Sequence, residues 1–347
     1  MTLISRPAGQ GHEPEQARHA SHRPESETSS RTSSHPGQRS PRAFGPGWDG
    51  SEASLWRPRT GCGTGCLPAD GAVAKAAPQV VAIRVASGLV VLAAAGVAVL
   101  VFPLLSPPRR VRVMRGIAKA LLRSIGVRQR TAGRLPRGGA LLVANHVSWL
   151  DALVLLAYGP VRLLAKCEVV GWPLIGRLAT AAGAVFIDRS RPRMLPATVA
   201  AVATALRNGQ VVAVFPEGTT GCGQAPAVFR PAMFQAAIDA GAPVVPVALR
   251  YFAAGDPTTV VAFLGDDSLL ASIARVLTTR RLRVSLTAHP ALHPAAGASR
   301  RALARTAAAV VAAPLLPLPP ASPLRPHSAG QSRATPAGPP PRAHVAA

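Results

Sequence analysis

The stretch Gly139-Ala-Leu-Leu-Val-Ala-Asn-His-Val-Ser-Trp-Leu-Asp151 decides the fold of this chain. Its first half, residues 139–144, is an apolar run typical of a buried β-strand. Its second half carries a histidine that is followed five positions later by an aspartate. We expect a helix over residues 148–157, which places the two polar side chains where a strand ends. Ligands of open α/β sheets bind at that edge.

His146 and Asp151 have the residue types of a catalytic pair. A neutral imidazole accepts a proton from an alcohol, and a carboxylate on its other nitrogen fixes the tautomer and stabilises the cation that forms. A structural alternative stays open, because Ser148-x-x-Asp151 is also a pattern that caps the first turn of a helix. Asn145 and Ser148 are candidates for supporting roles beside the pair.

Short β-rich runs alternate with helical stretches from about residue 138 onward. The expected strands are residues 140–144, 161–166, 184–187, 211–215, 244–250, 259–263 and 283–288. The expected helices are residues 148–157, 173–182, 193–208, 231–240, 268–279 and 299–313. This alternation predicts an α/β fold with a mostly parallel or mixed sheet flanked by helices. Pro246 within a strand indicates a bulge or a sheet edge.

Four regions follow from composition. Residues 1–77 and 314–347 are rich in Pro, Ser, Gly or Ala and are expected to be disordered tails. Residues 78–130 should form a helical membrane-anchoring region, and residues 131–313 the catalytic domain. The first tail lacks the short apolar core of a signal peptide.

Residues 85–108 contain no charged side chain and are long enough to cross a bilayer as a helix. More Lys and Arg residues follow this run than precede it, which predicts that the catalytic domain lies on the cytoplasmic face. Residues 111–125 predict a basic amphipathic helix suited to an anionic membrane surface. An ordinary domain helix with a solvated basic face fits residues 111–125 equally well.

The chain has 39 Lys plus Arg residues against 15 Asp plus Glu residues, a formal net charge of +24. This excess suits a polyanionic partner such as an anionic membrane or a phosphorylated substrate. Aromatic residues make up only 4% of the chain, which argues against a nucleic-acid partner. Cys62, Cys66, Cys167 and Cys222 show no metal-site spacing, so we expect incidental reduced cysteines and no metal.

Two further polar clusters follow expected strands. Residues 184–187 are followed by the pair Asp188-Arg189, and Arg189 could bind a phosphate with two hydrogen bonds. Glu217, Gly218 and Thr219 come after residues 211–215, where a glycine permits close backbone approach and a threonine offers a hydroxyl and an amide to a phosphate oxygen. A surface ion pair and a plain Pro-Glu-Gly turn are the structural alternatives for these clusters.

Taken together, these segments resemble the four ordered sequence blocks of the glycerolipid acyltransferase family. The matching residues are Asn145-His146-x-x-x-x-Asp151, Lys166-x-Glu168, Gly183-x-x-Phe186-Ile187-Asp188-Arg189, Phe215-Pro216-Glu217-Gly218-Thr219 and Val245-Pro246-Val247. The resemblance covers about residues 112–288 and is strongest to bacterial 1-acyl-glycerol-3-phosphate acyltransferases. Thr220-Gly221-Cys222 departs from the Arg-Ser that many members carry, which leaves the acceptor lipid open.

The resemblance implies the glycerolipid acyltransferase fold and acyl transfer from acyl-CoA or acyl-ACP, without a further cofactor, to the sn-2 hydroxyl of lysophosphatidic acid. His146 would be the general base and Asp151 would orient it. Arg189, Glu217, Gly218 and Thr219 would hold the acceptor phosphate, with Lys166 in support. A lyso-ornithine lipid or another lysophospholipid is the alternative acceptor. A non-catalytic membrane lipid-binding protein and a basic nucleic-acid-binding module are alternatives of other classes.

Overall fold

The structure is a computed structural model, and it describes residues 58, 60–225, 228–265, 267–295 and 297–313. All of these residues belong to one compact unit. Residues 1–57 of the tail expected at residues 1–77, and the whole tail expected at residues 314–347, lie outside the described residues.

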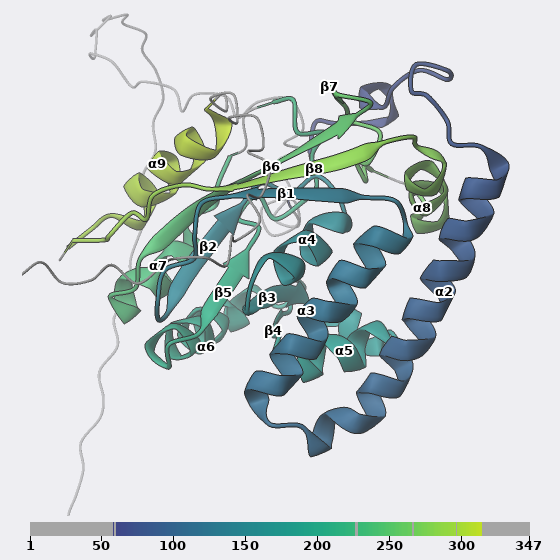
Figure 1. Ribbon diagram of the computed structural model, residues 1–347. Helices are drawn as coiled ribbons and strands as arrows, with labels where there is room; N and C mark the ends of the chain where they lie inside the picture. The colour runs from purple at the N-terminus through teal and green to yellow at the C-terminus, as the bar shows by residue number, and fades with distance from the viewer. Residues whose placement is uncertain (1–57, 59, 226–227, 266, 296, 314–347) are drawn as a thin grey trace, which may run out of the picture. The chain divides into compact units, whose positions relative to one another are not determined.

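A mixed β-sheet forms the centre of this unit (Figure 1). The strand order is β1-β8-β6-β2-β5-β3-β4, and the short β7 pairs with β6. Neighbouring strands are parallel except for β6 with β8 and β6 with β7. The strands are β1 (Arg128–Ala132), β2 (Ala140–Ala144), β3 (Val161–Lys166), β4 (Val185–Ile187), β5 (Val211–Val214), β6 (Val244–Ala253), β7 (Asp256–Pro257) and β8 (Leu282–Ala288). The expectation of a mostly parallel or mixed sheet is confirmed.

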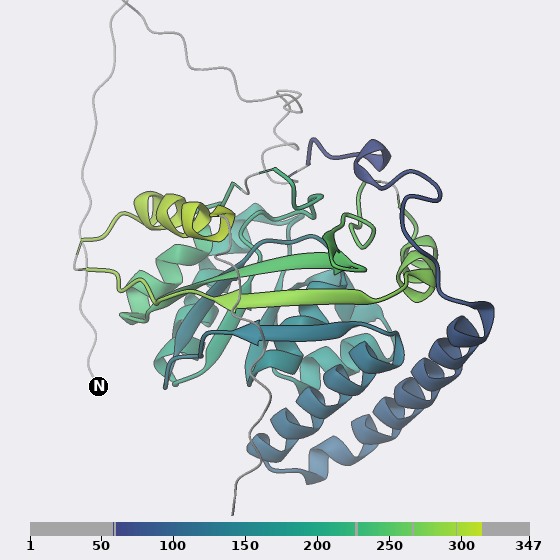
Figure 2. The same ribbon diagram turned by 45° about the horizontal axis from the view of Figure 1, so that its top comes forward.

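Helices cover both faces of the sheet (Figures 1 and 2). The α-helices are α2 (Pro78–Val101), α3 (Pro107–Ser124), α4 (Leu150–Tyr158), α5 (Ile175–Ala181), α6 (Leu195–Arg207), α7 (Ala232–Ala240), α8 (Leu269–Thr278) and α9 (Arg300–Ala312). Short 3-10 helices span Thr64–Cys66, Phe102–Leu104, Cys167–Gly171 and Pro192–Met194.

The central strand β2 divides the hydrophobic core into two layers, because successive side chains of a strand point to opposite faces. Leu142 packs in the cluster formed with α3 and α4. Leu141 and Val143 pack in the cluster formed with α6, α7 and α9. All five residues of β2 are buried. A strand that is covered on both faces must be apolar throughout, which is why residues 140–144 form an uninterrupted apolar run.

Helices α2 and α3 form an antiparallel hairpin beside the sheet (Figure 1). Ser87 near the start of α2 contacts the carbonyl of Ser124 at the end of α3, and Arg84 bonds the carbonyls of Leu277 and Thr279. The first half of α2 is therefore bonded both to the end of α3 and to the C-terminal end of α8. Helix α3 buries Met114, Ala118 and Leu122, and α3 packs on α4. The apolar face of α3 is thus used in packing, as the domain-helix interpretation expects.

Helix α2 leaves large apolar side chains exposed along its length, among them Ile83, Leu89, Val90, Val97 and Leu100. The segment Pro78–Leu104 is long and apolar enough to cross a membrane by length and composition, and its most apolar 18-residue window has a mean hydropathy of 2.6. This helix begins seven residues before the expected uncharged run at residue 85. The structure confirms one long apolar helix in this region, which ends at Val101 and not at the expected residue 108. That it anchors the chain to a membrane stays a prediction.

Two strand assignments were wrong. Residues 259–263 were expected to be a strand because they are apolar, but they form a buried turn in which the Ala262 amide donates to the Thr259 carbonyl at 2.8 Å. Strand β1 was not expected because four of its five residues, Arg128 to Thr131, are polar. It lies at the sheet edge, where charged side chains discourage pairing with other chains. The sheet therefore begins at Arg128 and not at the expected boundary of residue 131.

Pro246 does not lie in an edge strand, because β6 pairs with both β2 and β8. Its effect on pairing is nevertheless present. Two residues of β6 and three residues of the opposite segment lie between the Val247–Ala288 pair and the Val244–Leu292 bridge. This offset of one residue is the bulge-like irregularity that a residue without an amide hydrogen favours.

Residues 60–77 were expected to belong to a disordered tail, and this was wrong. They bind segments far away in the sequence: the hydroxyl of Thr259 donates to the Cys66 carbonyl at 2.7 Å, and the Ala76 amide donates to the Thr278 carbonyl at 2.7 Å. The Arg280 amide donates to the Ala74 carbonyl at 2.9 Å. Composition could not reveal contacts that depend on residues about 200 positions away.

Deleting residues 1–77 should lower the melting temperature of the detergent-solubilised protein by roughly 3–10 °C, because several hydrogen bonds worth about 1 kcal/mol each are lost. Deleting only residues 1–57 is the matched control and should leave the melting temperature within about 1 °C of the full chain. Equal melting temperatures for the two truncated proteins would show that residues 60–77 contribute nothing to stability.

Candidate active site

The buried carboxylate of Asp151 organises the edge of the sheet where β2 ends. Its Oδ2 atom accepts hydrogen bonds from His146 Nδ1 at 2.9 Å, from the Val147 amide at 2.6 Å and from the Ser148 amide at 2.8 Å. Its Oδ1 atom accepts from the Tyr251 hydroxyl at 2.5 Å. Asp151 has no exposed surface. A charge in such a place is tolerated because donors surround it.

Asp151 makes the contacts that both sequence interpretations expect. The amides of Val147 and Ser148 lie at the start of α4, so Asp151 satisfies backbone donors near the helix N-terminus as a capping residue does. The same oxygen binds the imidazole of His146. The carboxylate therefore fixes the backbone and the ring of His146 with one set of bonds.

The imidazole of His146 is held in one orientation. Nδ1 faces Asp151, and the ring stacks on Phe215 with centroids 4.0 Å apart and an interplanar angle of 12°. The side chain keeps 23% of its surface exposed. Because Nδ1 donates to the carboxylate, Nε2 is the nitrogen left to accept a proton. This geometry can perform general-base chemistry on a hydroxyl group.

Tyr251 is a member of this cluster that sequence reasoning missed. It lies in β6, one residue beyond the end of the expected strand at residue 250. Burial raises the pKa of Tyr251 well above its usual value, and the Asp151 carboxylate raises it further. Tyr251 therefore remains a neutral hydrogen-bond donor to Asp151. Continuing the strand alternation from Leu249 to Tyr251 would have placed this hydroxyl on a buried face.

Glu217 supports His146 through the backbone. Its Oε1 atom accepts a hydrogen bond from the His146 amide at 2.8 Å. Burial raises the pKa of Glu217 to about 7, the His146 amide opposes this shift, and the Asp151 charge adds to it. Arg189 does not pair with this carboxylate, because its Nη1 atom donates to the Gly218 carbonyl instead. Glu217 thus contacts the histidine and not Arg189.

Two arginines approach the loop that follows β5. Arg189 binds the Gly218 carbonyl, and Arg230 lies close enough that its Cδ atom would contact a β-carbon added at Gly218. Burial lowers the pKa of both guanidinium groups, and the Arg230 charge lowers that of Arg189 further. Arg230 is a second residue that sequence reasoning missed, since no local motif surrounds it. Two close, partly buried cations form a site suited to an anion.

Gly218 adopts a φ of 77°, a left-handed conformation that favours glycine. Thr219 is half-buried in the same loop. The next residue, Thr220, donates its hydroxyl to the Phe263 carbonyl. The Gly221 amide donates to the His146 carbonyl at 2.8 Å. The loop is therefore tied to the histidine at two points, through Glu217 and through Gly221.

The supporting candidates have different places. The Asn145 side chain donates to and accepts from the backbone of Leu249, at 3.0 Å and 2.8 Å, and so extends the pairing of β2 with β6. Ser148 is fully buried, and its backbone amide binds Asp151. Lys166 is exposed at the end of β3, where its charge acts on Glu168. The structure thus brings Asn145 and Ser148 to the histidine and places Lys166 near Glu168.

Sulfur ligands gather at one point of the described chain. The Sγ atoms of Cys62, Cys66 and Cys222 all lie within 4.8 Å of one another. In the sequence, Cys62 and Cys66 have no further metal-binding residue near them. The structure places the Sγ atom of Cys222 beside theirs. Cys222 follows directly after the loop that carries Gly218.

A histidine paired with a buried carboxylate, beside a cationic loop at the end of parallel strands, is an arrangement suited to general-base chemistry on an anionic substrate. The family model described as Acyltransferase matches residues 126–250, which include every member of this cluster except Tyr251.

The chain is 37% identical over 202 residues to the lyso-ornithine lipid O-acyltransferase of Pseudomonas aeruginosa. The aligned region covers 58% of this chain and 77% of that protein. The chain is also 35% identical over 182 residues to the 1-acyl-sn-glycerol-3-phosphate acyltransferase of Neisseria gonorrhoeae. This aligned region covers 52% of this chain and 71% of that protein. The chain belongs to the glycerolipid acyltransferase family and is an acyltransferase.

The fold agrees with this membership. The crystal structure of PlsC, the 1-acyl-sn-glycerophosphate acyltransferase of Thermotoga maritima, superimposes with a TM-score of 0.53 at 21% sequence identity. The match covers 67% of this chain and 92% of that chain. The expected glycerolipid acyltransferase fold is confirmed.

The raised pKa of Glu217 predicts a pH-dependent contribution to stability. Its folded-state pKa of about 7 exceeds the ordinary value of 4.5, so the contribution is complete below about pH 4.5 and is lost as the pH rises through about 7. In Glu217→Gln, this decline in melting temperature between pH 4.5 and pH 7 should disappear. Melting curves across this range measure the effect.

The matched control is Asp239→Asn, which makes the same carboxylate-to-amide change at an exposed position on α7. This variant should keep the decline of the unmodified chain. A decline of the same size in Glu217→Gln would show that Glu217 does not titrate in this range.

Proposed function

We propose that this acyltransferase moves a fatty acyl group from acyl-CoA or acyl-ACP to the sn-2 hydroxyl of 1-acyl-glycerol-3-phosphate and forms phosphatidic acid. One observation carries this proposal. Two neighbouring residues of one loop bind the proposed base and the proposed phosphate-binding arginine. Glu217 accepts a hydrogen bond from the His146 amide, and the Gly218 carbonyl accepts one from Arg189. A hydroxyl and a phosphate on one small molecule can therefore be held together.

The reaction proceeds by direct attack. His146 Nε2 takes the proton of the acceptor hydroxyl as its oxygen attacks the thioester carbonyl, and Asp151 stabilises the imidazolium that forms. The tetrahedral intermediate then collapses by breaking the carbon–sulfur bond. The departing thiolate takes the proton back from His146. The products are the new ester and the free thiol, and no covalent acyl-enzyme and no additional cofactor are needed.

The cationic loop favours a phosphate acceptor. A phosphate monoester offers several negative oxygens, which two guanidinium groups can share. Arg189 and Arg230 would bind these oxygens, with Gly218 and Thr219 presenting the backbone and a hydroxyl from the same loop. An ornithine head group combines a carboxylate with an ammonium group, and the ammonium would be repelled by the same pair of arginines.

A lyso-ornithine lipid is the second candidate acceptor, and the similarity to the lyso-ornithine lipid O-acyltransferase of Pseudomonas aeruginosa supports it. The histidine-based chemistry would be unchanged, because that reaction also transfers an acyl group to oxygen. The two candidates differ in the group that must be bound beside Arg189.

We further propose that the α2–α3 hairpin holds the enzyme on an anionic membrane at the cytoplasmic face, where acyl thioesters are made. The exposed apolar side of α2 would enter the lipid. A basic cavity of about 1270 Å³ lies between α2, α3 and β1 and suits anionic head groups. Its cationic lining includes Lys75, Arg115, Lys119, Arg128, Arg280 and Arg283.

His146→Ala should lower kcat by about 10²–10⁴-fold, because loss of a general base typically costs that much. The assay uses detergent-solubilised full chain, lysophosphatidic acid and a labelled acyl-CoA or acyl-ACP, with product analysis of the lipid. His293→Ala removes an exposed histidine outside the site and should keep normal turnover. Unchanged turnover of His146→Ala would remove the base assignment.

Arg189→Ala should raise KM for lysophosphatidic acid by at least about tenfold, since a charge-assisted hydrogen bond contributes about 1.5–3 kcal/mol. Arg191→Ala removes an exposed arginine two residues away and should leave KM unchanged. The same assay with lyso-ornithine lipid decides the acceptor. Formation of ornithine lipid without phosphatidic acid would overturn the phosphate assignment and keep the acyl-transfer chemistry.

A further inference from the structure

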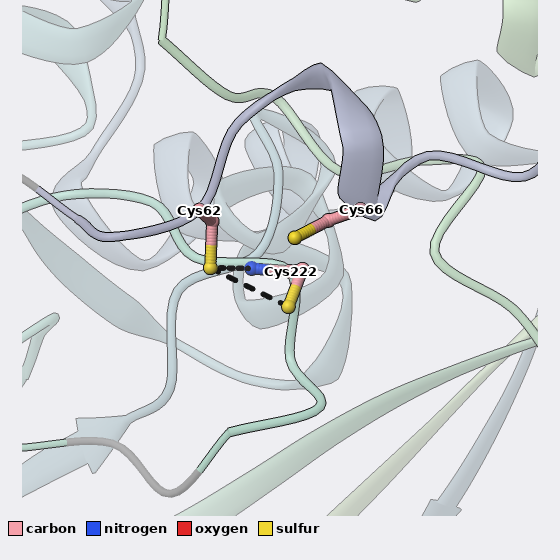
Figure 3. Close-up of side chains that lie close together, drawn as sticks. All are labelled: Cys62, Cys66 and Cys222. Carbon is pink, nitrogen blue, oxygen red and sulfur yellow. Dashed lines mark hydrogen bonds between the residues drawn. The ribbon is translucent and has the colours of Figure 1, made fainter.

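Three of the four cysteines of this chain converge from two distant segments (Figure 3). Cys62 and Cys66 come from the segment that precedes α2, and Cys222 comes from the loop after β5. The Sγ atoms of Cys62 and Cys222 are 3.4 Å apart, and the Cys222 amide approaches Cys62 Sγ at 3.4 Å. All three sulfur atoms lie within 4.8 Å of one another. Figure 3 shows the three sulfur atoms lying close together.

This spacing suits a shared metal ion. Zinc binds thiolate sulfur at about 2.3 Å, which places two sulfurs of a tetrahedral site about 3.8 Å apart. The Cys62–Cys222 separation of 3.4 Å is close to this value and the other two separations are at most 4.8 Å, so small side-chain rotations would bring all three sulfurs to one ion. A water molecule would complete the tetrahedron. Soft sulfur ligands favour zinc over magnesium or calcium.

A disulfide explains this arrangement less well. A disulfide requires sulfurs about 2.0 Å apart and joins only two of them, which would leave the third thiol beside the bond without a partner. A metal ion uses all three sulfurs at once. Cys222 is buried, and Cys62 and Cys66 are half-buried. Thiols make only weak hydrogen bonds, so a cation satisfies such a group of sulfurs better than S–H contacts do.

The position of the three cysteines indicates that the ion would stabilise the loop that carries Gly218. Pro58 lies against Gly218, where an added β-carbon would come within 2.7 Å of its Cγ atom. Gly221, which precedes Cys222, donates its amide to the His146 carbonyl. An ion bound to Cys222 and to the segment of Cys62 and Cys66 would therefore fix the loop that carries Gly218.

We propose that Cys62, Cys66 and Cys222 bind one Zn²⁺ ion that fastens residues 60–67 to the loop of residues 218–222. Each thiol releases its proton to solvent when its sulfur binds the ion, so binding releases up to three protons. The ion takes no part in acyl transfer. This site replaces the sequence-based expectation of incidental cysteines at these three positions.

The test is the metal content of the full chain, purified in detergent under reducing conditions without chelator. We expect about one zinc ion per chain, and less than about 0.2 in Cys62→Ser, Cys66→Ser and Cys222→Ser. The matched control is Cys167→Ser, because Cys167 contacts Glu168 and not the other cysteines. It should keep the zinc content of the unmodified chain.

A second measurement does not depend on the variants folding. Zinc of the unmodified chain is exchanged for Co²⁺, and thiolate ligation produces a sulfur-to-cobalt charge-transfer band in the near ultraviolet. Titration with a mercurial reagent should release the ion as the thiols react. Absence of zinc together with absence of the cobalt band would overturn the proposal. So would equal zinc in all four variants, or a thiol count that shows a disulfide between Cys62 and Cys222.

Discussion

The site depends on one buried negative charge. Moving a carboxylate out of water costs several kcal/mol unless donors replace the lost hydration. Asp151 receives four donors, from the imidazole of His146, two backbone amides and the hydroxyl of Tyr251. These donors come from the end of β2, the start of α4 and the interior of β6. The same charge therefore positions the histidine and joins three elements of the fold, so the site and the sheet edge cannot vary independently.

The sequence predicted the elements whose signal is local. Residues 140–144 are apolar because β2 is covered on both faces, and the polar residues that follow lie at the strand end as expected. The missed features depend on distance in the sequence. Tyr251 and Arg230 reach the site from β6 and from the segment before α7. Polar β1 is a strand because it pairs with β8, a partner about 150 residues away. No window of neighbouring residues contains that information.

The turn at residues 259–263 shows how apolar sequence can mislead. Val260 and Val261 are buried, as they would be in a strand. The segment instead places its backbone polar groups beside the site: the Phe263 amide donates to the Val147 carbonyl at 3.0 Å, and the Phe263 carbonyl accepts from Thr220. The buried segment therefore supports the backbone at Val147 and at Thr220, and it adds no strand to the sheet. Periodicity reports that a segment is buried and says little about which hydrogen bonds it makes.

The exposed apolar side of α2 has a consequence for how substrate is found. An enzyme held at a lipid surface meets its lipid substrate by diffusion in two dimensions, within a thin layer in which that substrate is concentrated. Its turnover should then follow the mole fraction of substrate among the surrounding lipids and not the bulk concentration. A water-soluble thioester donor would instead diffuse to the site from the aqueous phase. The two reactants would thus reach His146 by separate routes and would not compete for the same approach.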